Sequence, residues 1–116
     1  MVRKANVITM EALQGGRGSA EIHMIVPKEE LYNSAGMYAK VVLQPGSSVG
    51  WHTHTGETEP YYILEGEGIF IDDDGSRTPV SAGDVCTIIP GQSHSIENVS
   101  DTEPLSFMAL IYYDLR

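Results

Sequence analysis

The sequence predicts an all-β protein, and three observations support this fold class. Twelve glycines and six prolines are spread along a chain of 116 residues, and Val and Ile occur in short runs. Such runs favour short strands separated by tight turns over long helices. The turn signals recur at short intervals, which is typical of a sandwich or barrel of antiparallel strands. The length suits a single domain with one core.

The expected strands follow one another between these turns. They occupy residues 6–9, 20–26, 37–44, 48–53, 59–64, 67–72, 77–81, 84–89, 94–99 and 105–113. The turns between them read PGSS, EGEG, DDDGS, SAGD, PGQS and SDTEP. One helical turn is expected within residues 27–33, starting at Pro27. We expect one domain, 1–116, with an N-terminal arm, residues 1–35, that adds edge strands to a barrel, residues 36–116.

Three features suggest sites but are better explained by structure. The run from Asp72 to Gly75 lacks the ligand spacing of a calcium loop, and Asp-Gly is a strong hairpin signal. Cys86 is the single cysteine, and its setting in DVCTII indicates a buried, inert strand position. His23 lies in the expected strand 20–26 and is interpreted as a strand histidine with a local partner.

Charge restricts the possible partners. The chain has 16 acidic and 7 basic residues, a formal net charge of −9, so nucleic acid and anionic membranes are not expected to bind. A small-molecule ligand is the expected partner. The apolar segment LSFMALIYY is about half as long as a membrane span requires, and the N-terminus has no continuous apolar signal region. We therefore expect a soluble, unexported, cytoplasmic protein.

The segment WHTHTGETEPYY carries the pattern of a metal site. His52 and His54 are two residues apart, so on a strand they project from the same face and can bind one ion. Glu59 is five residues further on and would face the other way on an unbroken strand. We therefore expect a bend in TGET, made easy by Gly56, that turns Glu59 inward. His94, after the turn PGQS, supplies the fourth expected ligand.

Spaced in this way, these residues resemble the two signature motifs of the cupin superfamily. The first match is Gly46, five residues, His52-Thr53-His54, four residues, Glu59, six residues and Gly66. The second is Gly83, later Gly91, two residues, His94, three residues and Asn98. One departure is that Ile89 stands where the second motif usually has its leading proline. The chain resembles small single-domain bacterial cupins of unassigned function.

The resemblance implies a small double-stranded β-helix (jelly-roll) barrel with one divalent metal ion per chain. Three imidazoles and a carboxylate suit Mn, Fe, Co, Ni or Zn, and the sequence does not choose among them. An octahedral ion would leave two positions open for a chelating ligand, whereas a tetrahedral zinc could be closed and structural. The family does not fix a reaction, because it includes isomerases, dioxygenases, lyases, sugar binders and sensors.

Tyr61 is the candidate catalytic residue. It shares the inward face with Glu59 and Ile63, and its phenol could move a proton to or from a metal-bound substrate if the ion and burial lower its pKa. Some small cupin lyases are thought to use a tyrosine in the matching place. The structural interpretation of Tyr61 is an aromatic of the barrel wall. The expected substrate pocket consists of Tyr61, Ile63, Phe70, Phe107 and Met108.

Nearby residues receive structural interpretations. Glu57 is expected to be solvated, with the alternative that it replaces Glu59 as a ligand. Trp51 faces away from the metal, in wall or interface packing. Met10, Met24, Met37 and Met108 are expected in the core, some of them beside the pocket.

Two functions remain open at this stage. The leading hypothesis is a metal-dependent enzyme of the isomerase, lyase or dioxygenase type, acting on a sugar, sugar acid or carboxylate that chelates the ion. The alternative is a binding or sensing module that holds the same kind of ligand without converting it. We also expect a homodimer, because exposed edge strands invite pairing across a twofold axis.

Overall fold

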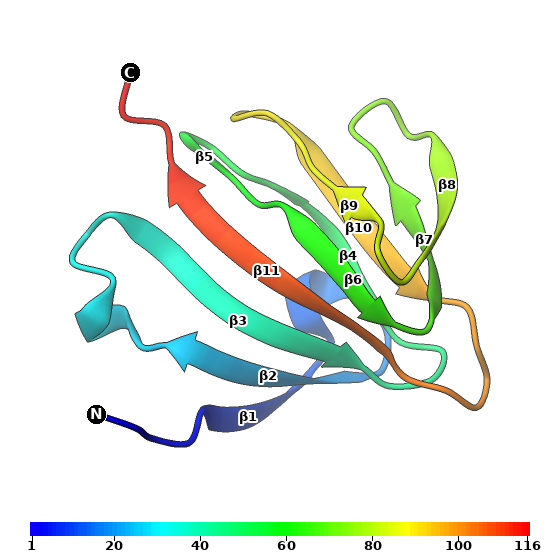
Figure 1. Cartoon of the computed structure of the whole chain (residues 1–116). Coiled ribbons are helices and arrows are strands. Elements are labelled where there is room, and N and C mark those ends of the chain that lie inside the picture. Colours follow the sequence, from blue (N-terminus) through cyan, green and yellow to red (C-terminus); the bar gives the residue numbers. More distant parts are fainter.

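Eleven strands and two short 3₁₀ turns make up the computed structural model of the protein, which describes residues 1–116 (Figure 1). The first four strands are β1 (Asn6–Glu11), β2 (Ser19–Val26), β3 (Ala35–Leu43) and β4 (Ser48–Thr53). They are followed by β5 (Glu57–Thr58), β6 (Tyr61–Glu65), β7 (Glu67–Ile71) and β8 (Arg77–Ser81). The last are β9 (Val85–Cys86), β10 (Ser93–Asn98) and β11 (Leu105–Tyr113), and the turns are η1 (Leu13–Gly15) and η2 (Lys28–Glu30).

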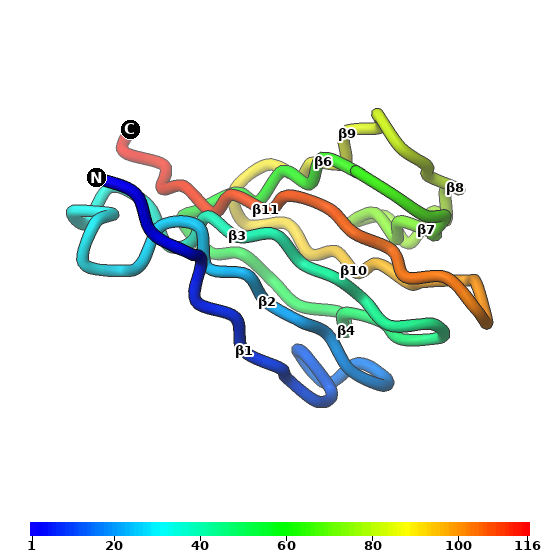
Figure 2. The backbone as a smooth tube through the Cα atoms, turned by 60° about the horizontal axis from the view of Figure 1, so that its bottom comes forward, coloured from blue at the N-terminus to red at the C-terminus, as the bar shows by residue number.

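The strands form two antiparallel sheets that face each other (Figures 1 and 2). The larger, seven-stranded sheet has the order β1-β2-β3-β11-β6-β9, with β5 paired to β11. The smaller, four-stranded sheet has the order β4-β10-β7-β8. The predicted all-β class is therefore confirmed, and the strands expected at 48–53, 77–81 and 105–113 have the predicted bounds.

The core lies between the sheets and follows the alternation of side chains along each strand. On β11, Leu105, Phe107 and Ala109 are buried and face the smaller sheet, which contributes Ile96 of β10. Cys86 also belongs to this core. Burial raises the pKa of its thiol to about 11, which keeps it protonated and unreactive near neutral pH, in line with the structural interpretation of this residue.

The local turns have the predicted kinds of structure. The acidic run forms the hairpin between β7 and β8, where the Asp72 backbone N–H donates to the Ser76 carbonyl at 3.0 Å. Gly75 has a φ of +83°, a backbone conformation that glycine adopts without strain. The helical turn expected within 27–33 is the 3₁₀ turn η2, which is three residues long. No helix of the protein has the length and apolar character needed to cross a membrane.

The N-terminal segment closes one side of the barrel by docking on β4. Here two backbones meet at glycines: a Cβ atom at Gly16 would collide with the Ser48 carbonyl oxygen, and one at Gly50 with the Gln14 carbonyl oxygen. The Arg17 backbone N–H also donates to Ser48 Oγ at 2.9 Å. This close packing holds η1 against β4, at the end of the barrel where the histidines lie.

The outer edge of the larger sheet is β1, which pairs with β2 alone. All six residues of β1 are exposed. The structure describes one chain, so pairing across this edge in a homodimer stays a prediction, as does the division into an arm of residues 1–35 and a barrel of residues 36–116.

Candidate metal centre

The backbone bends between the second histidine and the glutamate, as expected. His54 follows the end of β4, and its carbonyl accepts a hydrogen bond from Gly91 N–H at 2.7 Å while its own N–H donates to the Gln92 carbonyl at 3.1 Å. Gly56 then turns the chain with a φ of +71°. After β5 the chain presents Glu59 to the interior, where it is 4% exposed. The bend thus makes His54 and Glu59 both face inward.

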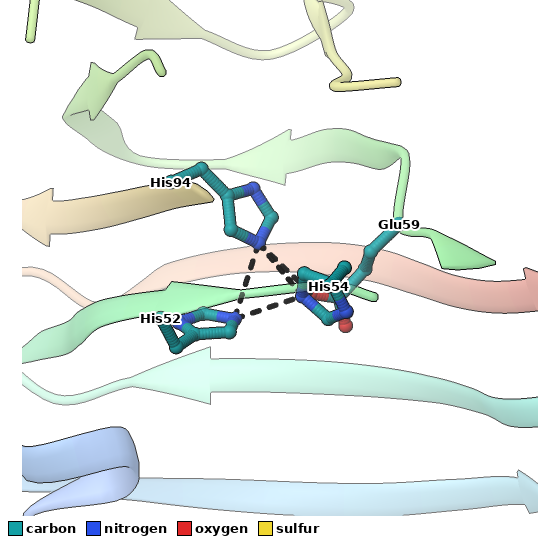
Figure 3. Close-up of side chains that lie close together, drawn as sticks. All are labelled: His52, His54, Glu59 and His94. Carbon is teal, nitrogen blue, oxygen red and sulfur yellow. Dashed lines mark hydrogen bonds and ion pairs between the residues drawn. The ribbon is translucent and has the colours of Figure 1, made fainter. Parts of the chain in front are cut away.

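The structure brings all four predicted ligands to one point inside the barrel (Figure 3). The antiparallel register of β4 and β10 places His52 opposite His94. His94 Nε2 lies 3.1 Å from the Nε2 atoms of both His52 and His54. The carboxylate oxygen Glu59 Oε1 lies 3.1 Å from His54 Nε2 and 3.2 Å from His94 Nε2. The four ligating atoms, one from each of His52, His54, Glu59 and His94, all lie within 4.8 Å of one another.

Hydrogen bonds at the far side of two rings fix which nitrogen carries the proton. His52 Nδ1 lies 2.7 Å from the Gly50 carbonyl oxygen, and His54 Nδ1 lies 2.8 Å from Glu57 Oε1. A carbonyl and a carboxylate only accept hydrogen bonds, so both Nδ1 atoms are donors. In the neutral rings the Nε2 atoms of His52 and His54 therefore present lone pairs to the centre of the cluster.

This donor set fits a divalent metal ion. Two ligands bound at about 2.1 Å and at right angles to each other are about 3.0 Å apart, close to the 3.1 Å between the nitrogens. A proton on His94 Nε2 could bridge to only one of the two lone pairs, whereas a cation satisfies both. The residues His52, His54, Glu59 and His94 can accordingly hold one divalent ion, and nothing in the set distinguishes one transition metal from another.

Electrostatics favour the ligand forms of two members of the cluster. Burial opposes ionisation of Glu59, but the adjacent imidazoles of His52, His54 and His94 outweigh it and hold the pKa of the carboxyl well below its usual range. Burial lowers the pKa of His94, which keeps its imidazole neutral. The neighbouring Glu59 carboxylate, together with that of Glu57, raises the pKa of His54, because both favour the protonated ring. Glu59 is the negative charge at the centre.

A cavity of about 250 Å³ opens beside this cluster. It is bordered by three of the four clustered residues, by Tyr61 and by side chains from both sheets and from η1. The lining residues are Ile8, Met10, Leu13, Gln14, Ile22, Met24, Met37, Val41, Val49, His52, His54, Glu59, Tyr61, Phe107 and Ile111. None of them is Lys or Arg. The polar lining residues are His52, His54 and Glu59 of the cluster, together with Tyr61 and Gln14.

Of the five predicted pocket residues, the structure places two in the cavity lining, two in the core and one on the outer face of the larger sheet. Tyr61 and Phe107 line the cavity. Ile63 and Phe70 are buried in the core, away from the lining. Met108 lies on the outer face of the larger sheet, beside Lys40 and Tyr62 in the strand register. Since neighbouring residues of a strand face opposite ways, Phe107 and Met108 cannot both line the pocket, and the expectation for Met108 is corrected.

Tyr61 is a wall aromatic in direct contact with the cluster. Its ring stacks on that of His94, with centroids 5.0 Å apart and an angle of 22° between the planes. It is also in edge contact with Phe70. The side chain is fully buried, and this burial, with the nearby Glu59 charge, raises the pKa of the phenol well above its usual value. Tyr61 is therefore protonated and can donate a hydrogen bond at the metal end of the cavity.

Sequence reasoning missed two contributions to the site. Glu57, expected in solvent, is half-buried and accepts the hydrogen bond from His54 Nδ1. Its place three residues after His54, across a glycine turn, was the available signal. The second contribution is the part of the wall formed by Ile8 and Gln14 of the N-terminal segment. Met10, which also lines the cavity, was among the methionines of which some were expected beside the pocket. The alternation of Ile8 and Met10 indicates that both face the same side of one strand. It does not indicate which strands lie opposite them.

The remaining candidates have local, structural roles. His23 lies outside the cluster, with its Nε2 3.1 Å from Glu21 Oε1 on the same strand. Trp51 faces outward and is 51% exposed. Ile89, at the departure from the second motif, donates its backbone N–H to Gln92 Oε1 at 2.9 Å, which closes the turn before β10 without the usual proline.

Comparison with known proteins agrees with the fold. The Cupin domain family matches residues 39–111, which include all four clustered residues. A protein of Thermotoga maritima named oxalate-binding protein is 47% identical over 114 residues, covering 96% of this chain and 93% of that protein.

Solved structures give the same picture. The crystal structure of a predicted oxalate decarboxylase from Thermotoga maritima superposes with a TM-score of 0.89 at 43% identity, covering 97% of this chain and 98% of the other. The polyketide cyclase RemF of Streptomyces resistomycificus has a TM-score of 0.75 at 17% identity, covering 97% of this chain and 78% of the other. The second likeness concerns the fold alone.

Proposed function

Because this chain belongs to the Cupin domain family, we propose that it binds a small carboxylate ligand through one divalent metal ion held by His52, His54, Glu59 and His94. The observation that carries the proposal is the pair of fixed tautomers. With both Nδ1 atoms committed as donors to Gly50 and Glu57, the opposite nitrogens of two rings point their lone pairs at one place. Beside that place lies a cavity of ligand size.

The ion would supply positive charge and open coordination positions, which suits a ligand with two adjacent oxygens. The protein residues have the complementary tasks. Glu59 balances part of the metal charge, while Glu57 and Gly50 hold the rings of His54 and His52 in the binding orientation. The cavity lining contains no Lys or Arg that could bind a carboxylate by itself. Recognition of a carboxylate would therefore depend on the ion.

The names of two matches, both from Thermotoga maritima, support a carboxylate as the ligand class. One protein at 47% identity is named for binding oxalate, and one at 43% identity is described as a predicted oxalate decarboxylase. Oxalate carries adjacent oxygens on two joined carboxylates and is therefore the first ligand to test on this chain.

Thermal unfolding of metal-free and metal-loaded protein tests this function. We expect oxalate to raise the melting temperature of protein loaded with Mn, Fe, Co, Ni or Zn, by a stabilisation of about 2.7 kcal/mol at a concentration of 100 times Kd. Metal-free protein should show no shift. An oxalate shift of equal size with and without metal, or none with any of the five metals, would contradict the proposal.

A second candidate function, catalysis on the bound ligand, is favoured by the position of Tyr61. It carries the only hydroxyl group among the residues that line the cavity. It stacks on His94 and lies two residues after Glu59. A phenol in this place could act as a general acid in an isomerase or lyase reaction, donating a proton to a ligand atom that gains negative charge, provided that a bound ion lowers the pKa that burial raises.

The Tyr61→Phe variant separates the two functions. If the protein is an enzyme, we expect a fall in kcat of about 10²–10⁴-fold, the usual contribution of a positioned acid, with metal content unchanged. The ring remains in the variant, so stacking on His94 and the barrel wall are preserved. Turnover of a converted substrate by Tyr61→Phe at the wild-type rate would exclude this role.

A further inference from the structure

Most of the cavity is apolar, although its metal end is polar. Apart from the clustered residues and Tyr61, Gln14 is the only polar residue in the lining. The rest of the wall consists of Ile, Met, Leu, Val and Phe side chains. A ligand that is charged at both ends would place its second charge against this wall, where an unpaired carboxylate is costly.

The sheet register shows how this apolar wall is built. Ile8 pairs with Ile22, Ile22 with Val41, and Val41 with Phe107, on four neighbouring strands. These four residues lie on the inner face and all line the cavity. Strands in a sheet are about 4.8 Å apart, so the row extends over about 14 Å. Met24, Met37 and Ile111 border it on the same face.

The size of the cavity also exceeds what a two-carbon ligand needs. An apolar cavity of about 150 Å³ can already hold benzene, and the cavity here has about 250 Å³. Oxalate bound at the metal end would leave the part of the cavity lined by apolar side chains unfilled. Contact between that wall and a hydrocarbon chain would instead remove apolar surface from water and stabilise the complex.

We propose that the preferred ligand is a 2-oxo or 2-hydroxy carboxylic acid with an apolar chain. Its carboxylate and neighbouring oxygen meet the metal end at His52, His54 and Glu59, and its chain lies along the wall formed by Val41, Met37 and the adjacent apolar residues. The inference rests on the proposed metal-dependent binding of a carboxylate and specifies the part of the ligand beyond its chelating head.

A chain-length series tests the proposal by titration calorimetry on Mn(II)-loaded protein. The ligands are pyruvate, 2-oxobutanoate, 2-oxohexanoate and 2-oxooctanoate, with oxalate measured in parallel. We expect the affinity to rise by about fourfold for each methylene that becomes buried. An affinity that stays constant or falls with chain length would overturn this inference, and oxalate binding in the same preparation would then leave the proposed function standing. If neither oxalate nor any 2-oxo acid bound to protein loaded with Mn(II), nor to protein loaded with Fe, Co, Ni or Zn, both would be overturned.

Two methionine variants test where the hydrocarbon chain of the ligand lies. Met37→Gln introduces an amide of similar length into the cavity wall, and Met108→Gln makes the same change on the outer face of the same sheet. We expect Met37→Gln to lower the affinity for 2-oxooctanoate by at least about fourfold, the contribution of one methylene, and to leave pyruvate and Mn(II) affinities unchanged. Met108→Gln should change none of the three. Equal effects of the two variants, or unchanged 2-oxooctanoate affinity in Met37→Gln, would overturn the placement.

Discussion

The His54→Ala variant is expected to lose its bound metal. Protein purified without chelators, and without an affinity column that carries metal, should contain close to one divalent ion per chain. The variant should contain almost none. His54 Nε2 lies 3.1 Å from both His94 Nε2 and Glu59 Oε1. Loss of the His54 imidazole therefore removes the ligand that lies next to two of the other three. Elemental mass spectrometry measures the metal content directly and identifies the ion.

The matched control for this experiment is His23→Ala. His23 is the one histidine outside the cluster, and its Nε2 is next to Glu21 Oε1 on the outer face of β2. Loss of this imidazole should leave the metal content unchanged. If both variants kept the ion, or both lost it, the assignment of His52, His54, Glu59 and His94 as the binding site would be wrong.

The Glu57→Gln variant is expected to bind the metal about 10–100-fold more weakly, the usual effect of removing a group that orients a ligating histidine. The Glu57 carboxylate accepts a hydrogen bond from the Nδ1–H of His54, with Nδ1 and Oε1 2.8 Å apart, and so keeps the lone pair of Nε2 directed at the cluster. Glutamine has the same shape but no charge, and its amide NH₂ can turn toward Nδ1 and favour the wrong tautomer. Competition with a fluorescent chelator gives the affinity of each protein for Mn(II) or Zn(II).

Glu21→Gln is the corresponding control, because Glu21 also lies beside a histidine ring, that of His23, at 3.1 Å. It removes one negative charge from the protein but changes nothing at the cluster. A decrease in metal affinity of equal size in the two variants would assign the effect to net charge instead of to the orientation of His54. Unchanged affinity in Glu57→Gln would show that Glu57 has no part in holding this ring.

Much of the fold could be predicted because the relevant signals are local. Gly, Pro and Asp-Gly turns separate the strands in the sequence, and their bounds in the structure differ from the predicted ones by few residues. The inward orientation of Glu59 could also be predicted, since the alternation rule fails unless the chain bends at Gly56. In both cases the information lies within a few residues of the feature.

The cavity could not be predicted in the same way, because its wall depends on which strands are neighbours. Ile8 and Met10 contribute to it only because β1 pairs with β2 at the edge of the larger sheet. Gln14 contributes because η1 docks on β4, through a close approach of backbones at Gly50. The edge position of β1 was expected, but nothing in the residues indicates that η1 docks on β4 or that the inner face of β1 lines a cavity. Met108 was misplaced for another reason, since the alternation along β11 was not applied to two adjacent residues.

Gly50 connects the cavity wall to the cluster of candidate metal ligands. Its Cα carries no side chain, which lets the Gln14 backbone approach, and its carbonyl oxygen accepts the Nδ1 proton of His52 at 2.7 Å. A larger residue at position 50 would therefore push out the N-terminal segment and turn a metal-binding ring at the same time. We therefore expect ligand choice and metal affinity to change together when residue 50 is changed. A chimaera that takes its N-terminal segment from a relative must also keep a compatible glycine beneath it.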